Sequence, residues 1–210
     1  MEINRHQIGS DLNQSILTID NFYHDPEKIY SFAAQSKFNS NFPGVKTGKT
    51  DKYASVLDLP DDKELQHLMK RLTGYSTNSF VNRFQLNLAN VAQYSNIHWD
   101  GIDWIGLVYL GKSHDGEPGT NFYKHKRSGL HLCTPDTLKE ASDKMDVSAV
   151  FLRDMLLFSA RDDKEWDLIK TIEFRFNRFV CFPANVFHAN ASFWGTSAKD
   201  GRLVQAMFFK

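Results

Sequence analysis

The chain has 210 residues, of which 41% are hydrophobic and 13% aromatic, and its 17 phenylalanines predict a phenylalanine-rich core. Basic and acidic residues number 25 each, so no strong field exists to attract nucleic acid or an anionic membrane. No apolar run reaches membrane-spanning length, no signal-peptide core begins the chain, and two cysteines make neither a disulfide framework nor a CxxC zinc site. We therefore expect a cytoplasmic protein with no nucleic-acid or membrane partner.

The amino-terminal part predicts a strand followed by a helix. Residues 15–23 alternate apolar and polar side chains, which is typical of a strand. The helix begins with Asp25 as N-cap and Pro26 at its first position. Its inward face is expected to carry Ile29, Phe32 and Ala33.

A second helix is predicted over residues 60–75. The Asp61/Asp62 pair supplies its cap and Gly74 ends it. His67 lies between charged residues and is expected at the surface. The apolar residues that share one face of this helix are Leu65, Leu68, Met69 and Leu72.

From residue 80 onward, short strands dominate the pattern. A turn rich in glycine and proline, His114–Thr120, follows the second of them, and another turn lies at Asn177-Arg178. Many short strands with turn signals predict a sandwich or barrel. The strand-like stretches are 80–94, 102–111, 120–125, 172–183, 186–193 and 201–209.

A helical insertion interrupts these strands over about residues 134–165. Thr134 caps its first helix, and its second helix, within 147–160, is expected to turn Val150 and Leu157 inward. The fold class is therefore α+β and mainly β. We expect residues 1–210 to form a single domain, in which residues 1–79 pack on a β core formed by residues 80–210.

The stretch "NIHWDGIDWIGLVYLG", residues 96–111, combines a polar left half with an apolar right half. His98 and Asp100 are two positions apart, so in a strand they point to one face. They are either two solvated residues at a strand edge or two ligands aimed at one point. His188 follows an apolar strand and is either a boundary residue or a third ligand. Together the three make a two-histidine, one-carboxylate set, which leaves metal positions open.

Arg202 begins an apolar strand and shares one face of it with Val204, Ala206 and Phe208. If it points inward, its permanent charge needs a partner from elsewhere in the molecule. A dicarboxylate ligand would supply one in bidentate geometry. The alternative is an arginine whose head extends to solvent at the rim.

These residues carry a resemblance. The "HWD" motif, then His188, then Arg202 fourteen positions later, resembles the HxD…H…R pattern of the Fe(II)/2-oxoglutarate-dependent dioxygenase superfamily. "VYLG" resembles its prolyl-hydroxylase-like branch, with Tyr109 at the position of a tyrosine that contacts 2-oxoglutarate. "EPGTNFY" is similar to that branch's Gly-Gly turn, with Pro118 in place of the first glycine. The resemblance covers residues 80–210 well and the amino-terminal part loosely.

The resemblance implies a double-stranded β-helix, or jelly-roll core, and a cytoplasmic hydroxylase. His98, Asp100 and His188 would hold Fe(II), and Arg202 with Tyr109 would bind the distal carboxylate of 2-oxoglutarate. The reaction would release succinate and CO2 while oxidising a small-molecule or peptide substrate. Halogenases of the superfamily replace the ligand carboxylate with a small residue, so Asp100 favours hydroxylation.

Two other classes of protein stay open at this point. A cupin-like metal-binding protein or isomerase would keep the three ligands without using 2-oxoglutarate. A non-catalytic β-sandwich interaction domain would not need them. Hydrolase chemistry has no supporting motif, since no GxSxG occurs and Cys181 lies within an apolar strand. A zinc cluster is disfavoured because the spacings match no familiar site for His114, His125, His131 and Cys133.

Two minor features have more than one interpretation. The basic loop "KHKRSG", residues 124–129, is either a solvated loop or a contact for an anionic substrate. Trp99 and Trp104 either line the barrel mouth or pack. Metal-ligating histidines need hydrogen-bond partners on their other ring nitrogen, and the nearby candidates are Asn90, Tyr94 and Asn190.

Overall fold

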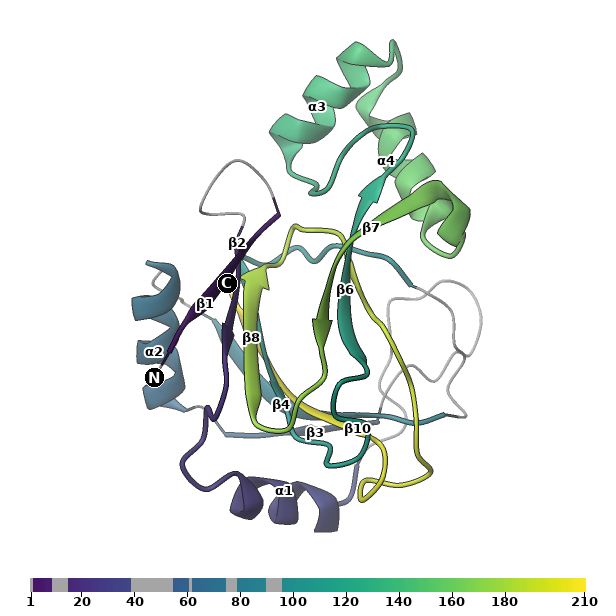
Figure 1. Cartoon of the computed structure of the whole chain (residues 1–210). Coiled ribbons are helices and arrows are strands. Elements are labelled where there is room, and N and C mark those ends of the chain that lie inside the picture. Colours follow the sequence, from purple (N-terminus) through teal and green to yellow (C-terminus); the bar gives the residue numbers. More distant parts are fainter. Residues whose placement is uncertain (1, 9–14, 39–54, 61, 75–78, 90–95) are drawn as a thin grey trace.

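The structure is a computed structural model that describes residues 2–8, 15–38, 55–60, 62–74, 79–89 and 96–210. Its strands form two antiparallel sheets (Figure 1). The larger sheet contains β1 (Asn4–Gln7), β2 (Ser15–Ile19), β3 (Ser55–Asp58), β4 (Phe80–Asn87), β5 (Trp104–Tyr109), β8 (Arg178–Pro183) and β10 (Arg202–Phe209), in the order β1-β2-β8-β5-β10-β4-β3. The smaller sheet contains β6 (Pro118–His125), β7 (Trp166–Glu173) and β9 (His188–Asn190), in the order β7-β6-β9.

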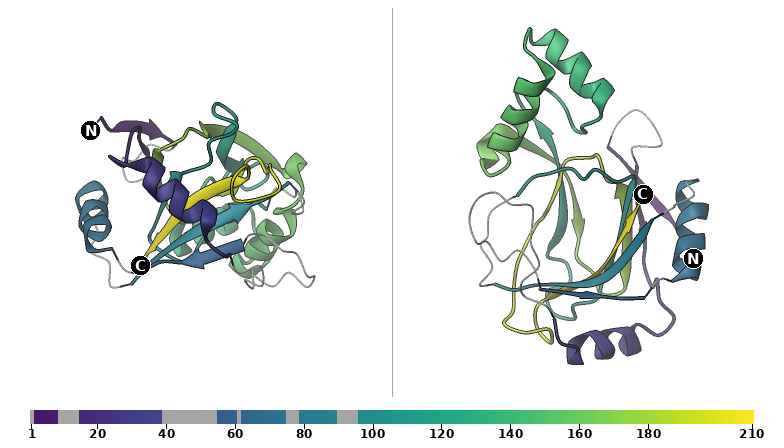
Figure 2. Two further views of the ribbon diagram at one scale, coloured as in Figure 1. Left: turned by 90° about the horizontal axis from the view of Figure 1, so that it is seen from below. Right: turned by 180° about the vertical axis from the view of Figure 1, so that it is seen from behind.

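Four α-helices lie within the described residues: α1 (Pro26–Gln35), α2 (Lys63–Thr73), α3 (Pro135–Lys144) and α4 (Ala149–Ser159). A short 3-10 helix, η2 (Asp163–Glu165), precedes β7. The predicted caps form: the side chain of Asp25 accepts from Lys28, that of Asp62 from Glu64 and Leu65, and that of Thr134 from Thr137. Helices α3 and α4 lie at the opposite end of the molecule from α1 (Figures 1 and 2).

The apolar side chains form three layers. The outer face of the larger sheet packs against α1 and α2 through residues such as Val108, Cys181 and Met69. The space between the two sheets is filled by alternate residues of the same strands, among them Leu107, Val180 and Val204, together with Phe122 of β6. The outer face of the smaller sheet packs against α3 and α4. A sheet buried on both faces explains why its strands are almost continuously apolar.

Strand pairing determines which residues enter the interior between the sheets. Strand β10 runs antiparallel to both β4 and β5, with Val204 opposite Tyr109. Because side chains alternate along a strand, Arg202, Val204 and Tyr109 all face the interior. Arg202 is fully buried, which confirms the inward orientation considered for it.

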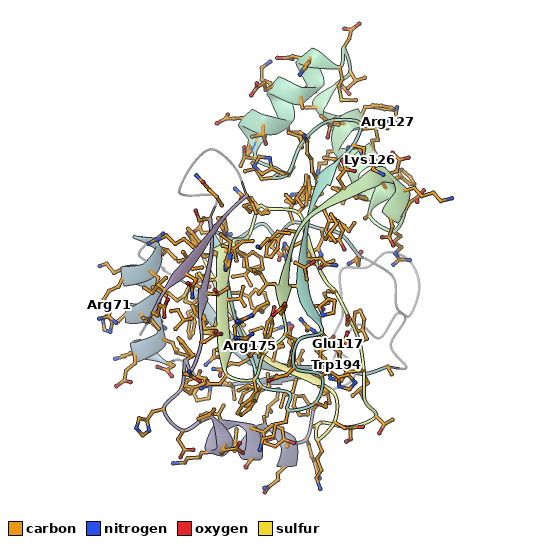
Figure 3. The ribbon with its side chains drawn as sticks, viewed as in Figure 1. Arg71, Glu117, Lys126, Arg127, Arg175 and Trp194 are labelled. Atoms are coloured by element: carbon orange, nitrogen blue, oxygen red, sulfur yellow. The ribbon has the colours of Figure 1, made fainter. Side chains whose placement is uncertain are left out.

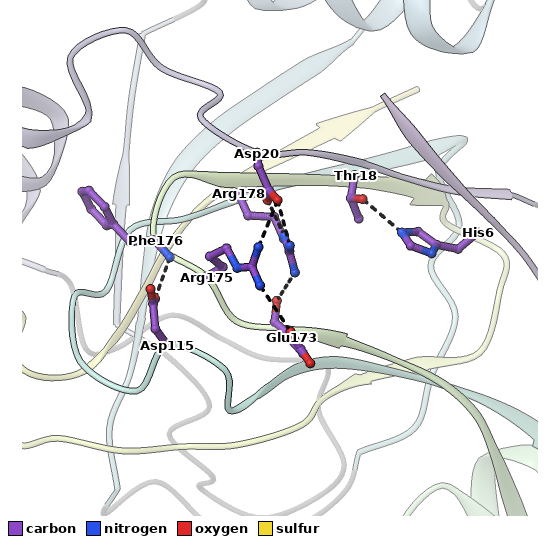
Figure 4. A network of polar contacts seen from close by, with 8 residues as sticks. All are labelled: His6, Thr18, Asp20, Asp115, Glu173, Arg175, Phe176 and Arg178. Atoms are coloured by element: carbon purple, nitrogen blue, oxygen red, sulfur yellow. Dashed lines mark hydrogen bonds and ion pairs between the residues drawn. The ribbon is translucent and has the colours of Figure 1, made fainter. Parts of the chain in front are cut away.

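A network of ion pairs lies where the ends of β2, β7 and β8 meet (Figure 4). Asp20, which follows β2, accepts two hydrogen bonds from Arg178, at 2.6 and 3.0 Å, and one from Arg175 at 3.3 Å. Arg175 also lies 3.7 Å from Glu173 of β7. This network connects β2 to the turn between β7 and β8. Beside this network, the main-chain N–H of Phe176 donates a hydrogen bond to the side-chain carboxylate of Asp115.

Most predicted elements are confirmed, and three side chains were assigned to the wrong face of their helices. Phe32 is 58% exposed, Val150 70% and Leu157 51%, whereas all three were expected to point inward. Helix α4 buries Leu152, Leu156 and Ser159 instead. The four-residue strands β1 and β3 were not predicted, and the predicted cap residue Asp61 lies outside the described residues.

The architecture is mostly β, with antiparallel sheets facing each other across an interior, and it is compatible with a jelly-roll core. An isolated bridge between His98 and His188 extends the smaller sheet beyond β9. In the part of the chain that the structure describes, no helix combines the length and the apolar character needed to cross a membrane.

Candidate metal centre

His98 and His188 are brought together by backbone pairing. The N–H of each donates to the carbonyl of the other, at 3.0 and 2.9 Å. Residues paired in this way lie directly opposite each other, and their side chains leave the sheet on the same face. The two imidazole rings consequently stand side by side, with centroids 4.4 Å apart.

Asp100 reaches the same point from two positions further along the chain, as its strand-like spacing predicts. Its main-chain N–H donates to the carbonyl of Ala184 at 2.8 Å, which fixes the segment against the end of β8. Its Oδ2 lies 3.8 Å from Nε2 of His98 and 3.6 Å from Nε2 of His188. Among the described residues, this is the one group of histidine, cysteine and acidic side chains whose ligand atoms converge, all within 4.8 Å.

Main-chain carbonyl groups orient both imidazoles. Nδ1 of His98 donates to the carbonyl of Asn96 at 2.7 Å, and Nδ1 of His188 donates to the carbonyl of Val186 at 2.8 Å. A carbonyl oxygen only accepts, so each Nδ1 carries a proton, and in the neutral ring Nε2 presents a lone pair. The predicted partner Asn190 is exposed and is not the partner of either ring, and Asn90 and Tyr94 lie outside the described residues.

Burial sets the charge of this group of ligands. It lowers the pKa of His188 to about 3, with a further contribution from His98, so the ring stays neutral in ordinary buffers. Burial raises the pKa of Asp100, and the nearby His98 opposes that shift. The side chain of His188 is 8% exposed, whereas those of His98 and Asp100 are 40% and 33% exposed. The group therefore opens to solvent on the side of His98 and Asp100.

The donor set fits a divalent metal ion. Two neutral imidazole nitrogens and one carboxylate are the facial set that suits non-haem iron. Ligands about 2.1 Å from a metal ion lie about 3 Å apart when adjacent in octahedral geometry. The separations of 3.6 and 3.8 Å between the carboxylate and the imidazoles are about 0.6–0.8 Å longer than this, a difference that small side-chain rotations can close. The open sides leave room for further ligands.

A second polar group lies deeper in the interior. The hydroxyl groups of Tyr109 and Thr120 are 2.7 Å apart, and Nη2 of Arg202 donates to the carbonyl of Gly119 at 2.9 Å. Tyr109 stacks on Phe174 with centroids 4.5 Å apart, and the guanidinium carbon of Arg202 lies within 6 Å of both rings. Burial lowers the pKa of Arg202 to about 10 and raises that of the Tyr109 phenol.

The two polar groups are linked through β6. Phe122 pairs with His188, and Thr120 lies two positions before it on the same interior face. Two residues of a strand span about 7 Å. Thr120 and the Gly119 carbonyl were not among the predicted site residues. Counting alternate positions back from Phe122 in "GTNF" would have identified Thr120 as an interior hydroxyl.

The remaining candidates are not part of the centre. His125 packs on Trp166 and His114 stacks on Trp194, so the four residues considered for a zinc cluster do not converge. Trp99 packs edge-on against Phe187 in the layer beneath α3 and α4, and Trp104 is buried under α1 and α2. Burial raises the pKa of the Cys181 thiol, as expected of an inert core cysteine.

Several solved structures are similar to this chain. A non-heme alpha-ketoglutarate-dependent carbocyclase from nogalamycin biosynthesis, SnoK, aligns with a TM-score of 0.54 and 11% identity, over 94% of this chain and 79% of its own. The non-heme alpha-ketoglutarate-dependent epimerase SnoN, from the same biosynthesis, aligns with a TM-score of 0.53, 15% identity and the same coverage. A prolyl-4-hydroxylase of Pseudomonas putida has a TM-score of 0.49 and 11% identity, over 93% and 92%.

At these identities the similarity is one of fold, which agrees with the antiparallel sheets and helices described above. No curated protein matches the sequence. One family model spans residues 1–209, and the chain therefore belongs to DUF6445, a family of unknown function.

Proposed function

We propose that this protein is an Fe(II)- and 2-oxoglutarate-dependent oxygenase that hydroxylates a small-molecule or peptide substrate. The observation that carries the proposal is the convergence of three ligand atoms beside an interior that holds a buried arginine. The resemblance of the sequence motifs and the fold shared with alpha-ketoglutarate-dependent enzymes support it. The double-stranded β-helix is the form of jelly roll that we assign to its two sheets.

In this proposal His98, Asp100 and His188 hold the metal ion. Their two Nε2 atoms and one carboxylate would supply three ligands to the ion, a set that suits non-haem iron and would leave it able to take 2-oxoglutarate. Bound Fe(II) and 2-oxoglutarate supply the oxidising chemistry, with succinate and CO2 as co-products. The hydrogen bonds from the two Nδ1 atoms to main-chain carbonyls keep the rings in the tautomer that the metal requires.

Arg202 and Tyr109 bind the distal carboxylate of 2-oxoglutarate. The interior is a low-dielectric environment, in which a buried guanidinium and a carboxylate stabilise each other if their hydrogen bonds are satisfied. Phe122, which pairs with His188, and Phe182, whose ring packs on that of His188, make the surroundings of this ligand apolar. On β6, Phe122 pairs with His188 and Thr120 contacts Tyr109, and these two positions are about 7 Å apart. A five-carbon dicarboxylate is long enough to span that distance.

The test is an anaerobic titration of the purified protein with Fe(II) and 2-oxoglutarate. We expect the weak visible charge-transfer band of chelated 2-oxoglutarate, and slow formation of succinate after oxygen is admitted. His188→Ala should abolish metal binding and the band. His67→Ala, which removes an exposed histidine on α2, is the matched control and should behave as the wild type.

Tyr109→Phe tests the cofactor assignment without removing volume from the core. It should weaken the binding of 2-oxoglutarate about tenfold, because one hydrogen bond to a charged group is lost, and it should leave the metal affinity unchanged. Bound metal without any band in the wild-type protein would contradict 2-oxoglutarate binding and would favour a cupin-like metal protein instead.

A further inference from the structure

A cavity of 420 Å³ opens on the surface where β1, β7 and the loop after β6 meet. Binding pockets for small molecules typically have volumes of about 300–1,000 Å³, so this one suits a compact ligand. One cation, one imidazole, one amide and two aliphatic side chains line it, and none of its described lining residues is a carboxylate. The lining residues are Gln7, Ile8, Lys124, Gly129, His131 and Ile169.

Backbone pairing links the lining of this cavity to the candidate metal centre, although no metal ligand lines it. Lys124 lies two positions beyond Phe122 on β6, a distance of about 7 Å, and Phe122 pairs with His188. Tyr123 and His125 pack on the layer beneath α3 and α4, so Lys124 lies on the same face as Phe122. The carbonyl of His131 accepts from the N–H of Phe187, the residue before His188.

The three cationic side chains of the basic loop lie in different surroundings. Lys126 donates to the carbonyl of Lys164 at 2.8 Å and lies 3.8 Å from Asp167. Lys126 and Arg127 lie beside α4 (Figure 3). Among the described side chains, no carboxylate forms an ion pair with Lys124. Burial lowers the pKa of the His131 imidazole, and the nearby charge of Lys124 lowers it further.

We propose that this cavity binds the anionic end of the primary substrate, a small aliphatic molecule with a terminal carboxylate or phosphate group. The ammonium group of Lys124 binds the oxyanion beside the imidazole of His131, while Ile8 and Ile169 contact the aliphatic part. The rest of the molecule extends along β6 toward the ligands. The assignment of this ligand as a substrate rests on the proposed oxygenase function, whereas the oxyanion site stands on the cavity itself.

Inorganic phosphate is the first probe. Titration into the metal-free protein, followed through the imidazole NMR signals of labelled histidines, should shift His131 with millimolar affinity. Lys124→Ala should weaken this binding at least tenfold. Lys126→Ala, which removes a cation from the same loop, should leave it unchanged. Equal binding in the wild type and Lys124→Ala would overturn the oxyanion site.

The substrate class is tested with pairs of short aliphatic acids and phosphates and their uncharged amides or alcohols. Some charged members should stimulate succinate formation by the Fe(II)-loaded enzyme, their neutral partners should not, and Lys124→Ala should lose most of the stimulation. Equal stimulation by charged and neutral members would overturn the substrate class. Absence of any 2-oxoglutarate turnover would instead contradict the oxygenase function, and the Lys124-dependent binding of phosphate would persist.

Discussion

The imidazoles of His98 and His188 are oriented by the main chain and not by side chains. In each case the ring bonds the carbonyl two residues earlier, at Asn96 and Val186. A carbonyl is present whatever residue occupies the position, so no side chain in the sequence could indicate this partner. That is why the candidates Asn90, Tyr94 and Asn190 could not be ranked from the sequence.

The pairing of the ligands was only partly predictable. His98 and Asp100 are two positions apart, and in a strand this local spacing alone places both side chains on the same face. The position of His188 opposite His98 depends on long-range pairing of two segments 90 residues apart. Only the resemblance to a known motif connected them, because strand alternation does not specify which strands become neighbours.

Gly119 provides a residue-scale prediction. A Cβ at this position would lie 2.9 Å from the carbonyl oxygen of Ile172, from the main-chain nitrogen of Phe174 and from Cζ of Tyr109. Gly119→Ala must therefore displace either β7 or Tyr109, and we expect the free energy of unfolding to fall by about 1–3 kcal/mol. Urea denaturation measures it, and an unchanged midpoint would contradict the close packing.

Gly101→Ala is the matched control, because no described atom beyond its two chain neighbours lies within 4 Å of the position that a Cβ would occupy there. Its free energy of unfolding should stay within about 0.5 kcal/mol of the wild type. The Gly119 carbonyl accepts a hydrogen bond from Arg202, so Gly119→Ala should also weaken the binding of 2-oxoglutarate if the proposed function is correct.

Helix α4 shows why the inward face of an element was misassigned. Its sequence, AVFLRDMLLFS, is apolar nearly all round, so helical periodicity does not distinguish one face from another. The structure buries Leu152 and Leu156, one turn apart, and leaves Phe158 88% exposed. Which face is buried depends on the layer formed with Phe187 and Ile97, and these residues are distant in sequence.

Two substitutions in α4 test that assignment. Leu156→Ala removes a fully buried side chain and should lower the free energy of unfolding by about 2–5 kcal/mol. Phe158→Ala removes a larger but exposed side chain and should change it by less than about 0.5 kcal/mol. Chemical denaturation of both variants decides the matter, and a larger loss in Phe158→Ala would show that the opposite face is buried.

The link between β2 and the β7–β8 turn predicts a dependence of stability on pH. Hydrogen bonds from Arg178 lower the pKa of Asp20 below its ordinary value, and Arg175 adds to the effect (Figure 4). A depressed pKa in the folded state means that the stabilisation is complete above the unfolded value, about 3.9, and is lost as the pH falls through the folded value.

Asp20→Asn should therefore destabilise the protein at pH 7, by about 1–2 kcal/mol for bonds to a charged group, and less at pH 3. Asp143→Asn is the control, because that carboxylate forms an exposed pair with Lys139 within α3. Its effect should be within about 0.5 kcal/mol at either pH. Denaturation midpoints across this range test both, and an equal loss at pH 7 and pH 3 would exclude the ion pair as the cause.

At the scale of the whole molecule, the central strands of the larger sheet were predicted and its two edge strands were not. Strands β5, β8 and β10 are central in the larger sheet, and their continuous apolar runs follow from burial on both faces. Strands β1 and β3 form the two edges of that sheet. An edge strand has fewer neighbours and fewer buried side chains, so its sequence carries little alternation. Strand β1, with the sequence NRHQ, shows this most clearly.

The arrangement of two polar groups in one interior leads to a prediction about global stability. A ligand that binds only the folded state stabilises it by about 2.7 kcal/mol at a concentration one hundred times its Kd. For a chain of this length, that corresponds to a rise in Tm of about 5–10 °C. If the metal ion and 2-oxoglutarate occupy adjoining positions, 2-oxoglutarate should raise the Tm further only after the metal ion has bound.

Calorimetry under anaerobic conditions can separate the two increments. Fe(II) alone should raise the Tm of the wild type, and 2-oxoglutarate should raise it further only when Fe(II) is present. His188→Ala should lose both increments, since the chelated ligand needs the metal. Tyr109→Phe should keep the first increment and show a smaller second one at the same 2-oxoglutarate concentration. A 2-oxoglutarate increment of equal size in His188→Ala and in the wild type would show that it binds away from the three ligands.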